Sequence, residues 1–284
     1  MAIMTEKAGN GLGAAAAARR KKEGWWRSRR LLIIGLRLAV VALIILAWQW
    51  VSGRWLPDYA ISKPTEVYTA LRQYLGSSAG WLDIQTTTEE IVLGFAFGVA
   101  LGTVMGLVLG SFRLAGQVLE PLIAAVNGIP KIALAPLFLL FFGIGEWSKI
   151  AIAITGVSFV VFYNIYLGLR LRERELVEIV QVMGGRRHHV LSYVTIPTLA
   201  SPFFAALKTS GPLAILGVIG GEFIASSQGV GHELFTAAEN LDAAAEFAGL
   251  IVLVVITLLL NGILTWLDNF VLKHLGLTPR SRRP

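Results

Sequence analysis

The residues best suited to chemistry are charged side chains inside otherwise apolar segments. Lys131 lies between two prolines in GIPKIALAP, beside Asn127 and Pro130, and Glu222 follows a glycine pair in LGVIGGEFIASSQGVG. A charged side chain at membrane depth is costly unless it is paired or hydrated. Two interpretations are open: a water-filled pathway in which Lys131 meets an anionic solute and Glu222 lines one half, or a fixed ion pair of Glu222 with Lys131 or Lys208.

A second distinctive stretch is polar and basic, LVEIVQVMGGRRHHVLSYVTIP over residues 176–197. Gly184 and Gly185 permit a sharp change of chain direction at its middle. A second short helix is expected over 186–194, ended by Pro197. The apolar residues before the glycines recur at i, i+3, i+4 and i+7, which predicts one face of a helix: Leu176, Ile179, Val180 and Met183.

This predicted helix–turn–helix presents an apolar face that is costly to expose. The face would fit a groove on a partner protein. It would equally fit the inner leaflet of a membrane, which Arg186 and Arg187 also suit. The pair His188–His189 is adjacent, so the two rings are expected on different sides of the helix, which argues against joint ligation of a metal.

Motifs of enzymes and nucleotide-binding sites are missing from the sequence. It contains no G-x-x-x-x-G-K-[ST], no H-E-x-x-H, no G-x-S-x-G and no cysteine. Without the first, the chain cannot bind ATP through a P-loop, and the others exclude the corresponding hydrolases. We therefore expect no catalytic residue, no metal site and no cofactor in this chain.

The composition indicates what must position these residues. The chain has 284 residues, of which 55% are hydrophobic and 15% charged, against about 25% charged in soluble domains. A membrane-spanning helix needs about 20 apolar residues. The sequence predicts an all-α membrane bundle of about six such helices, the third broken by prolines: 31–51, 91–110, 121–142, 150–169, 202–225 and 247–271.

Positive charge assigns an orientation to these spans. The two tails and the loops 111–119 and 170–196 carry 18 Lys and Arg, whereas the opposite loops carry three. Both termini and loop 170–196 are therefore expected in the cytoplasm. The net charge of +7 is explained by topology and lipid headgroups, so we infer no nucleic-acid binding from it.

The expected organisation follows from the spans. A basic cytoplasmic tail covers 1–30, and its low-complexity part is expected to be disordered or to lie on lipid headgroups. The first span is followed by an external loop, 52–84, with an amphipathic helix capped by Thr65 and running to Leu75. The core transmembrane region covers 85–272, and a second basic tail covers 273–284.

Glycine recurs at every fourth position of the second span: Gly94, Gly98, Gly102, Gly106 and Gly110. Such a strip lets another helix backbone approach closely. Close packing within the monomer is one interpretation, and a helix that moves against a neighbour or a second subunit is the other.

The segment around residues 176–197 resembles a known motif. Glu178, Gly184 six residues later, then Val194 and Pro197 are similar to the E-A-A…G…I-x-L-P motif of the permeases of ATP-binding-cassette (ABC) importers. Ile179 and Val180 stand where alanines are usual. The stretches LPDYAISKPTEV, GIPKIALAPLFLLFFGIGEWSKI and GEFIASSQGVGHEL resemble the nitrate/sulfonate/taurine branch, and the resemblance runs from about residue 55 to 275.

The resemblance implies a fold and partners. The chain would assemble in a bacterial inner membrane with a second copy of itself, with two cytoplasmic ATPase subunits that hold ATP and Mg, and with an extracytoplasmic binding protein. The 174–190 helix would couple the ATPase to the spans, with Glu178 capping or orienting it, Gly184 forming its turn and the apolar face holding it. The coupling residues would be Glu178, Ile179, Val180, Met183, Gly184, Gly185, Arg186 and Arg187.

The substrate stays open at this level. The resemblance implies a small anion such as nitrate, a sulfonate or taurine, and also permits a thiamine-precursor pyrimidine or another heterocycle. Two other classes remain as alternatives: a membrane receptor that docks a cytoplasmic partner without transport, and an ion-coupled carrier. The carrier would need paired ionisable groups deep in several spans, and the sequence indicates only Lys131 and Glu222.

Overall fold

The computed structural model describes residues 32–274 apart from 56 and 58, and the regular elements within them are helices. The predicted tail 1–30 and nearly all of the tail 273–284 lie outside the described residues. Five described helices are long and apolar enough to cross a membrane, and a bent helix pair can form a sixth span. The predicted all-helical membrane bundle is thus confirmed.

The described residues fall into two compact units that divide after Glu66, and each is described by itself. The first contains the apolar helix Leu32–Val51. Directly after this helix, the Ser52 hydroxyl donates a 2.5 Å hydrogen bond to the Ile61 carbonyl and so holds the following loop. The Arg54 guanidinium lies 5.4 Å from the centre of the Trp50 ring, a cation–π contact common where a span meets the interface.

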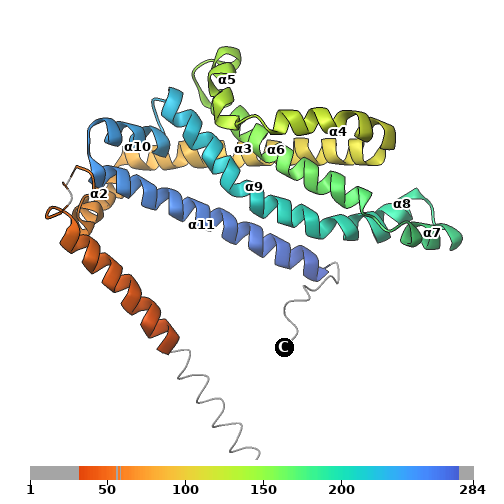
Figure 1. Cartoon of the computed structure of the whole chain (residues 1–284), viewed down its shortest axis with the longest axis horizontal. Coiled ribbons are helices and arrows are strands. Elements are labelled where there is room, and N and C mark those ends of the chain that lie inside the picture. Colours follow the sequence, from red (N-terminus) through yellow and green to blue (C-terminus); the bar gives the residue numbers. More distant parts are fainter. Residues whose placement is uncertain (1–31, 56, 58, 275–284) are drawn as a thin grey trace, which may run out of the picture. The chain divides into compact units, whose positions relative to one another are not determined.

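Apart from Pro64–Glu66, the remaining helices lie in the second unit (Figure 1). In chain order they are α2 (Pro64–Gly76), α3 (Ser78–Ser111), α4 (Arg113–Asn127), the 3₁₀ segment η1 (Lys131–Leu134), α5 (Ala135–Phe142), α6 (Glu146–Arg170), α7 (Arg174–Val182), α8 (Arg187–Val190), the π-helical segment η2 (Leu191–Thr195), α9 (Ile196–Ala225), α10 (Val230–Glu239) and α11 (Ala243–His274).

The glycine strip of α3 lies against α6. A methyl group built on Gly94 would meet the Ala153 Cβ at 2.6 Å, and one on Gly102 would meet the Ser158 carbonyl oxygen at 2.4 Å. The other three strip glycines face α6 side chains as closely. Any larger residue would push the two helices apart, so the strip sets their separation.

The core is built around α6, which packs against α3 on one side and α9 on the other. Val157, Val161 and Phe162 of α6 are fully buried, as is Val218 of α9. Helix α11 packs against α9 and α10. Helices α7 and α8 lie beyond the opposite end of α9 from α10 (Figure 1), so the two ends of α9 carry different structures.

Several boundaries differ from those predicted. The second span was expected to start a turn or more before residue 91, but helix α3 begins at Ser78, inside the predicted external loop 52–84, with the Ser77 hydroxyl accepting a 2.9 Å hydrogen bond from the Gly80 N–H as an N-cap. Helix α2 already begins at Pro64, so Thr65 is not its cap. The predicted loop 226–246 contains α10, which its few apolar residues did not reveal.

The third predicted span is strongly bent. Residues 116–127 and 131–142 meet at 86°. Pro130 sits at the break and Pro136 occupies the first turn of α5, where a missing N–H costs nothing. Tyr166 of α6 donates a 2.8 Å hydrogen bond to Glu120 of α4, and Arg170 pairs with the same carboxylate, so α4 is tied to α6.

Candidate functional site

The predicted coupling helix exists as α7 and presents an apolar surface. Val182 and Met183 are 89% and 82% exposed, and Leu176 and Ile179 are also exposed. We call these four residues the apolar ridge. Val180, predicted to belong to it, is half-buried instead. Among the described residues of the second unit, none covers these exposed side chains, so the ridge is available to a partner.

The end of α7 requires both glycines. The Gly184 N–H donates to the Gln181 carbonyl at 2.9 Å, and the Gly185 N–H donates to the Val180 carbonyl at 2.8 Å. This pair of bonds is the Schellman motif. Gly184 has φ +79°, which favours glycine. A Cβ on Gly185 would lie 2.5 Å from Val180 atoms.

The capping role predicted for Glu178 is wrong. Helix α7 begins at Arg174, so Glu178 lies in its middle, where no N–H is free to be capped. Its side chain is exposed on α7. An exposed carboxylate beside the apolar ridge can still orient a partner through its charge.

Two predictions about residues 186–197 are also wrong. His188 and His189 do not point apart: their Nε2 atoms lie 3.1 Å from each other, because the Arg186 N–H donates to the Nδ1 of His189 and turns that ring inward. Pro197 does not end a helix but lies in the first turn of α9. Among the described residues, no group of three or more His, Cys, Asp or Glu could hold a metal ion.

Lys131 caps the end of α4. Its ammonium group donates to the carbonyls of Val126, Asn127 and Ile129 at 3.3, 2.8 and 3.0 Å. These carbonyls carry the negative end of the helix dipole. The Nζ atom also lies 4.6 Å from the centre of the Phe159 ring. Lys131 therefore satisfies the backbone that the broken span leaves unpaired, while its side chain stays partly exposed.

Glu222 holds the chain that enters α10. It is 1% exposed, and its carboxylate accepts from the Thr87 hydroxyl at 2.7 Å and from the Gly231 N–H at 2.6 Å. The Val230 N–H in turn donates to the Thr87 hydroxyl at 2.8 Å. In this conformation Glu222 joins α3, α9 and α10 and does not line an open pathway. Its predicted pairing with Lys131 or Lys208 is wrong.

A buried ion pair near Glu222 escaped prediction. Glu90 of α3 pairs with Lys149 of α6, and both side chains are almost fully buried. Lys149 also donates to the Ser226 hydroxyl at 3.1 Å. Both charged residues immediately precede the apolar runs predicted as spans, which begin at residues 91 and 150. Only the three-dimensional packing places them inside.

Asp83 and Tyr74 extend this polar cluster toward α2. Asp83 accepts a 2.8 Å hydrogen bond from the Gly229 N–H, and the Tyr74 hydroxyl donates to Asp83 at 3.4 Å. Burial, with the nearby Asp83 carboxylate, raises the pKa of Tyr74, so its hydroxyl keeps its proton. Near the middle of α9, Lys208 pairs with Asp268 of α11, a partner that lay outside the predicted alternatives.

The sequence matches a family of transport proteins. Residues 98–275 fit the family described as "Binding-protein-dependent transport system inner membrane component". A Bacillus subtilis protein assigned to aliphatic sulfonates transport, SsuC, is 29% identical over 83% of this chain and 86% of its own length. The formylaminopyrimidine transport permease ThiX of Halalkalibacterium halodurans is 26% identical over 81% of this chain and 92% of its own.

A solved structure shares the fold. A chain from inward-facing conformations of the MetNI methionine ABC transporter superposes with a TM-score of 0.57, covering 70% of this chain and 97% of that chain. The sequence identity is 16%, so this likeness concerns the arrangement of the helices and not the solute.

Proposed function

This chain belongs to the binding-protein-dependent transport system inner membrane components, the multi-pass permeases of ABC importers, and we propose that two copies form a pathway driven by separate ATPase subunits. Each copy would hold one ATPase subunit through its apolar ridge. ATP and Mg would be held by those subunits, because this chain carries no P-loop.

The exposed ridge on α7 is the observation that carries this proposal. Large apolar side chains at the end of a helical projection are costly in water, and the Schellman turn after them fixes their direction. An apolar helix face that fits a groove is a common mode of protein recognition. A docked α7 would pass movements of the ATPase to α6, which precedes it in the chain, and through α8 and η2 to α9.

The orientation follows from charge. The basic segments that include 170–196 would face the cytoplasm, where the ATPase is. The opposite end, with α10 and the loop fixed by Glu222, would then face the extracytoplasmic binding protein.

The pathway would lie between the two copies, along the exposed side of the broken span. Asn127 and Pro130 are exposed there and Lys131 partly so. Lys131 would bind an anionic solute by giving up its hydrogen bond to one backbone carbonyl and donating to the solute instead. The organisation into a core region 85–272, flanked by a first span and basic tails, is part of the same proposal.

An anionic organic solute such as a sulfonate is our first candidate for the substrate. Its support is the likeness to SsuC together with the ammonium group at the break of the third span. A pyrimidine or similar heterocycle is the second candidate, favoured by the likeness to ThiX.

The test is ATP hydrolysis by the complete complex in lipid, with and without its binding protein, across sulfonates, taurine, nitrate and pyrimidines. We expect one loaded binding protein to stimulate hydrolysis and so to identify the substrate. Hydrolysis indifferent to every loaded binding protein would contradict these substrates. If no ATPase co-purifies with the chain, the ridge docks some other partner and the coupling proposal fails.

A further inference from the structure

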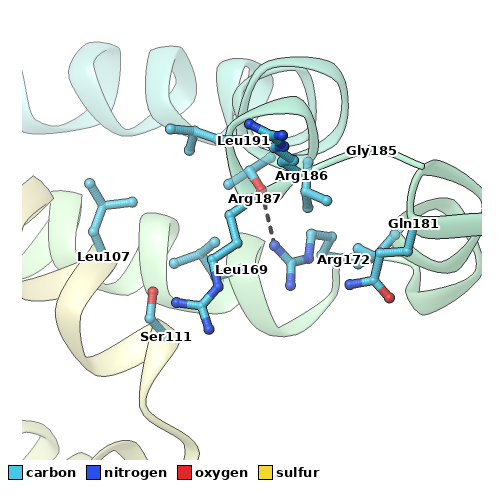
Figure 2. Close-up of a pocket in the computed structure, with 12 residues that line it drawn as sticks. Leu107, Ser111, Leu169, Arg172, Gln181, Gly185, Arg186, Arg187 and Leu191 are labelled. Carbon is cyan, nitrogen blue, oxygen red and sulfur yellow. Dashed lines mark hydrogen bonds between the residues drawn. The ribbon is translucent and has the colours of Figure 1, made fainter. Parts of the chain in front are cut away.

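A cavity of about 860 Å³ lies between the ends of α3 and α6 and the segment 172–195, which contains α7 and α8 and which we call the coupling projection. Figure 2 shows Leu107 and Ser111 of α3 on one wall, and Arg172 and Gln181 on the other. The cavity is separate from the apolar ridge, because none of the four ridge residues belongs to its lining. None of the described residues fills this space.

Positive charge gathers around the cavity without a counter-charge. Arg172, Arg186 and Arg187 belong to its lining and no carboxylate does. None of the three forms an ion pair with a described residue. By contrast Arg170, two residues before Arg172, is paired with Glu120. The unpaired arginines therefore distinguish this cavity from the neighbouring surface.

The side chains of Arg172 and Arg187 are both directed into the cavity region (Figure 2). Arg172 is positioned by a 3.0 Å hydrogen bond to the hydroxyl of Thr195, which is itself buried. This bond uses one nitrogen of the guanidinium, Nη1, and leaves its other N–H donors available. Two guanidinium groups at a shared space favour a phosphate, whose oxygens match their geometry.

Leucine and valine side chains form a further part of the lining, and the leucines lie where membrane-spanning helices end. Leu107 and Leu191 are exposed although they are large and apolar, and Leu169 lies one residue before the end of α6. A soluble phosphate would leave these leucines in water. An acyl chain would cover them.

We propose that this cavity binds an anionic phospholipid of the inner leaflet, with Arg172 and Arg187 on its phosphate and an acyl chain along Leu107, Leu169 and Leu191. The lipid would join the coupling projection to the spans. This site goes beyond the proposed transport function and does not need it, since lipid binding can be measured on the permease without its ATPase.

The experiment is native mass spectrometry of the full chain, released from detergent with one of three probes. Phosphatidylglycerol is the expected ligand, phosphatidylcholine with the same acyl chains tests the need for net charge, and glycerol 3-phosphate tests a soluble phosphate. We expect retention of phosphatidylglycerol alone. Losing a charged hydrogen-bond donor should weaken that binding about tenfold.

The variants separate this site from the basic tails. Arg172→Gln/Arg187→Gln removes two charges from the cavity, and Arg174→Gln/Lys273→Gln removes two exposed charges elsewhere. Arg187→Gln alone guards against misfolding, because the Arg187 side chain makes no hydrogen bond or ion pair with described residues. Both cavity variants should lose phosphatidylglycerol while the control keeps it.

Three outcomes would overturn the proposal. Equal loss in the control would assign the binding to general surface charge. Equal retention of phosphatidylcholine would show that the net charge of the lipid is not recognised and would overturn the choice of an anionic phospholipid. Retention of glycerol 3-phosphate as tight as that of phosphatidylglycerol would assign the cavity to a soluble phosphate.

Discussion

The hydroxyl of Thr87 in α3 donates a 2.7 Å hydrogen bond to the carboxylate of Glu222 in α9, 135 residues later. The same hydroxyl accepts from the Val230 N–H where α10 begins. One small side chain therefore joins α3 to α9 and α10, which lie far from it in the sequence. Its removal would leave a buried carboxylate oxygen and a buried N–H without partners.

Thr87→Val should therefore destabilise the protein by about 1–3 kcal/mol, the usual cost of leaving buried polar groups unsatisfied. Thr257→Val is the matched control, because the Thr257 hydroxyl donates only within its own helix, to the Leu253 carbonyl. The measurement is the thermal unfolding midpoint in detergent. Equal midpoints for the two variants would show that the Thr87 bonds contribute nothing.

The buried pair Glu90–Lys149 predicts a double-mutant cycle. Glu90→Gln or Lys149→Met alone leaves one buried charge unpaired and should cost about 3–5 kcal/mol. The double variant Glu90→Gln/Lys149→Met should recover much of that loss, because neither charge remains. Unfolding midpoints of all four proteins supply the coupling energy. Additive losses would mean that the two residues are independent.

Gly184→Pro should leave insertion intact and uncouple ATP hydrolysis from transport. Proline fixes φ near −65°, whereas Gly184 has φ +79°, so the Schellman turn cannot form. Gly184→Asn should keep most activity, because asparagine tolerates this conformation. Solute taken up per ATP hydrolysed, measured in vesicles with the complete complex, distinguishes them. Normal coupling in the proline variant would refute the coupling role.

Ile179→Ser/Met183→Ser should weaken attachment of the ATPase at least tenfold. Burying two such side chains contributes about 1.5–3 kcal/mol each, and the change removes them without adding charge. Glu175→Gln on the same helix serves as the control. Co-purification of the ATPase subunit at graded concentrations gives the affinity. Unchanged affinity would move the docking surface elsewhere.

Lys131→Ala should impair uptake more than assembly. The change removes both the proposed contact with an anionic solute and the cap on α4, whereas Lys131→Arg keeps the charge. Uptake kinetics and the yield of assembled complex are measured for both variants. If uptake falls only in proportion to the yield, Lys131 is a structural cap and has no contact with solute.

Much of the fold was predictable because its signals are local. Glycine at every fourth position of the second span predicted close helix packing, and apolar runs located the spans. The capping by Lys131 was not predictable, because it depends on the turn that follows α4. Glu90 and Lys149 were missed because charged residues at the edge of an apolar run are normally assigned to the interface.

Errors in the coupling projection have a similar origin. The Schellman turn could be anticipated from Gly184-Gly185, but the rings of His188 and His189 meet because a backbone N–H of Arg186 holds one of them. The sequence pattern predicts a helix end at Pro197, although proline is also common in the first turn of a helix. Each local pattern allowed two structures, and contacts between distant residues selected one.

The glycine strip packs α3 and α6 so closely that the two helices form one rigid unit. Along this seam the glycine backbone of α3 packs directly on α6 over about four turns, so no α3 side chain lies between the two helices at these positions to absorb a small displacement. Helix α6 has 25 residues and, at about 1.5 Å per residue, spans about 37 Å. It begins beside the Glu90–Lys149 pair and ends next to the coupling projection. A displacement of one end of α6 at one membrane face would thus move its other end, at the opposite face, by almost the same amount.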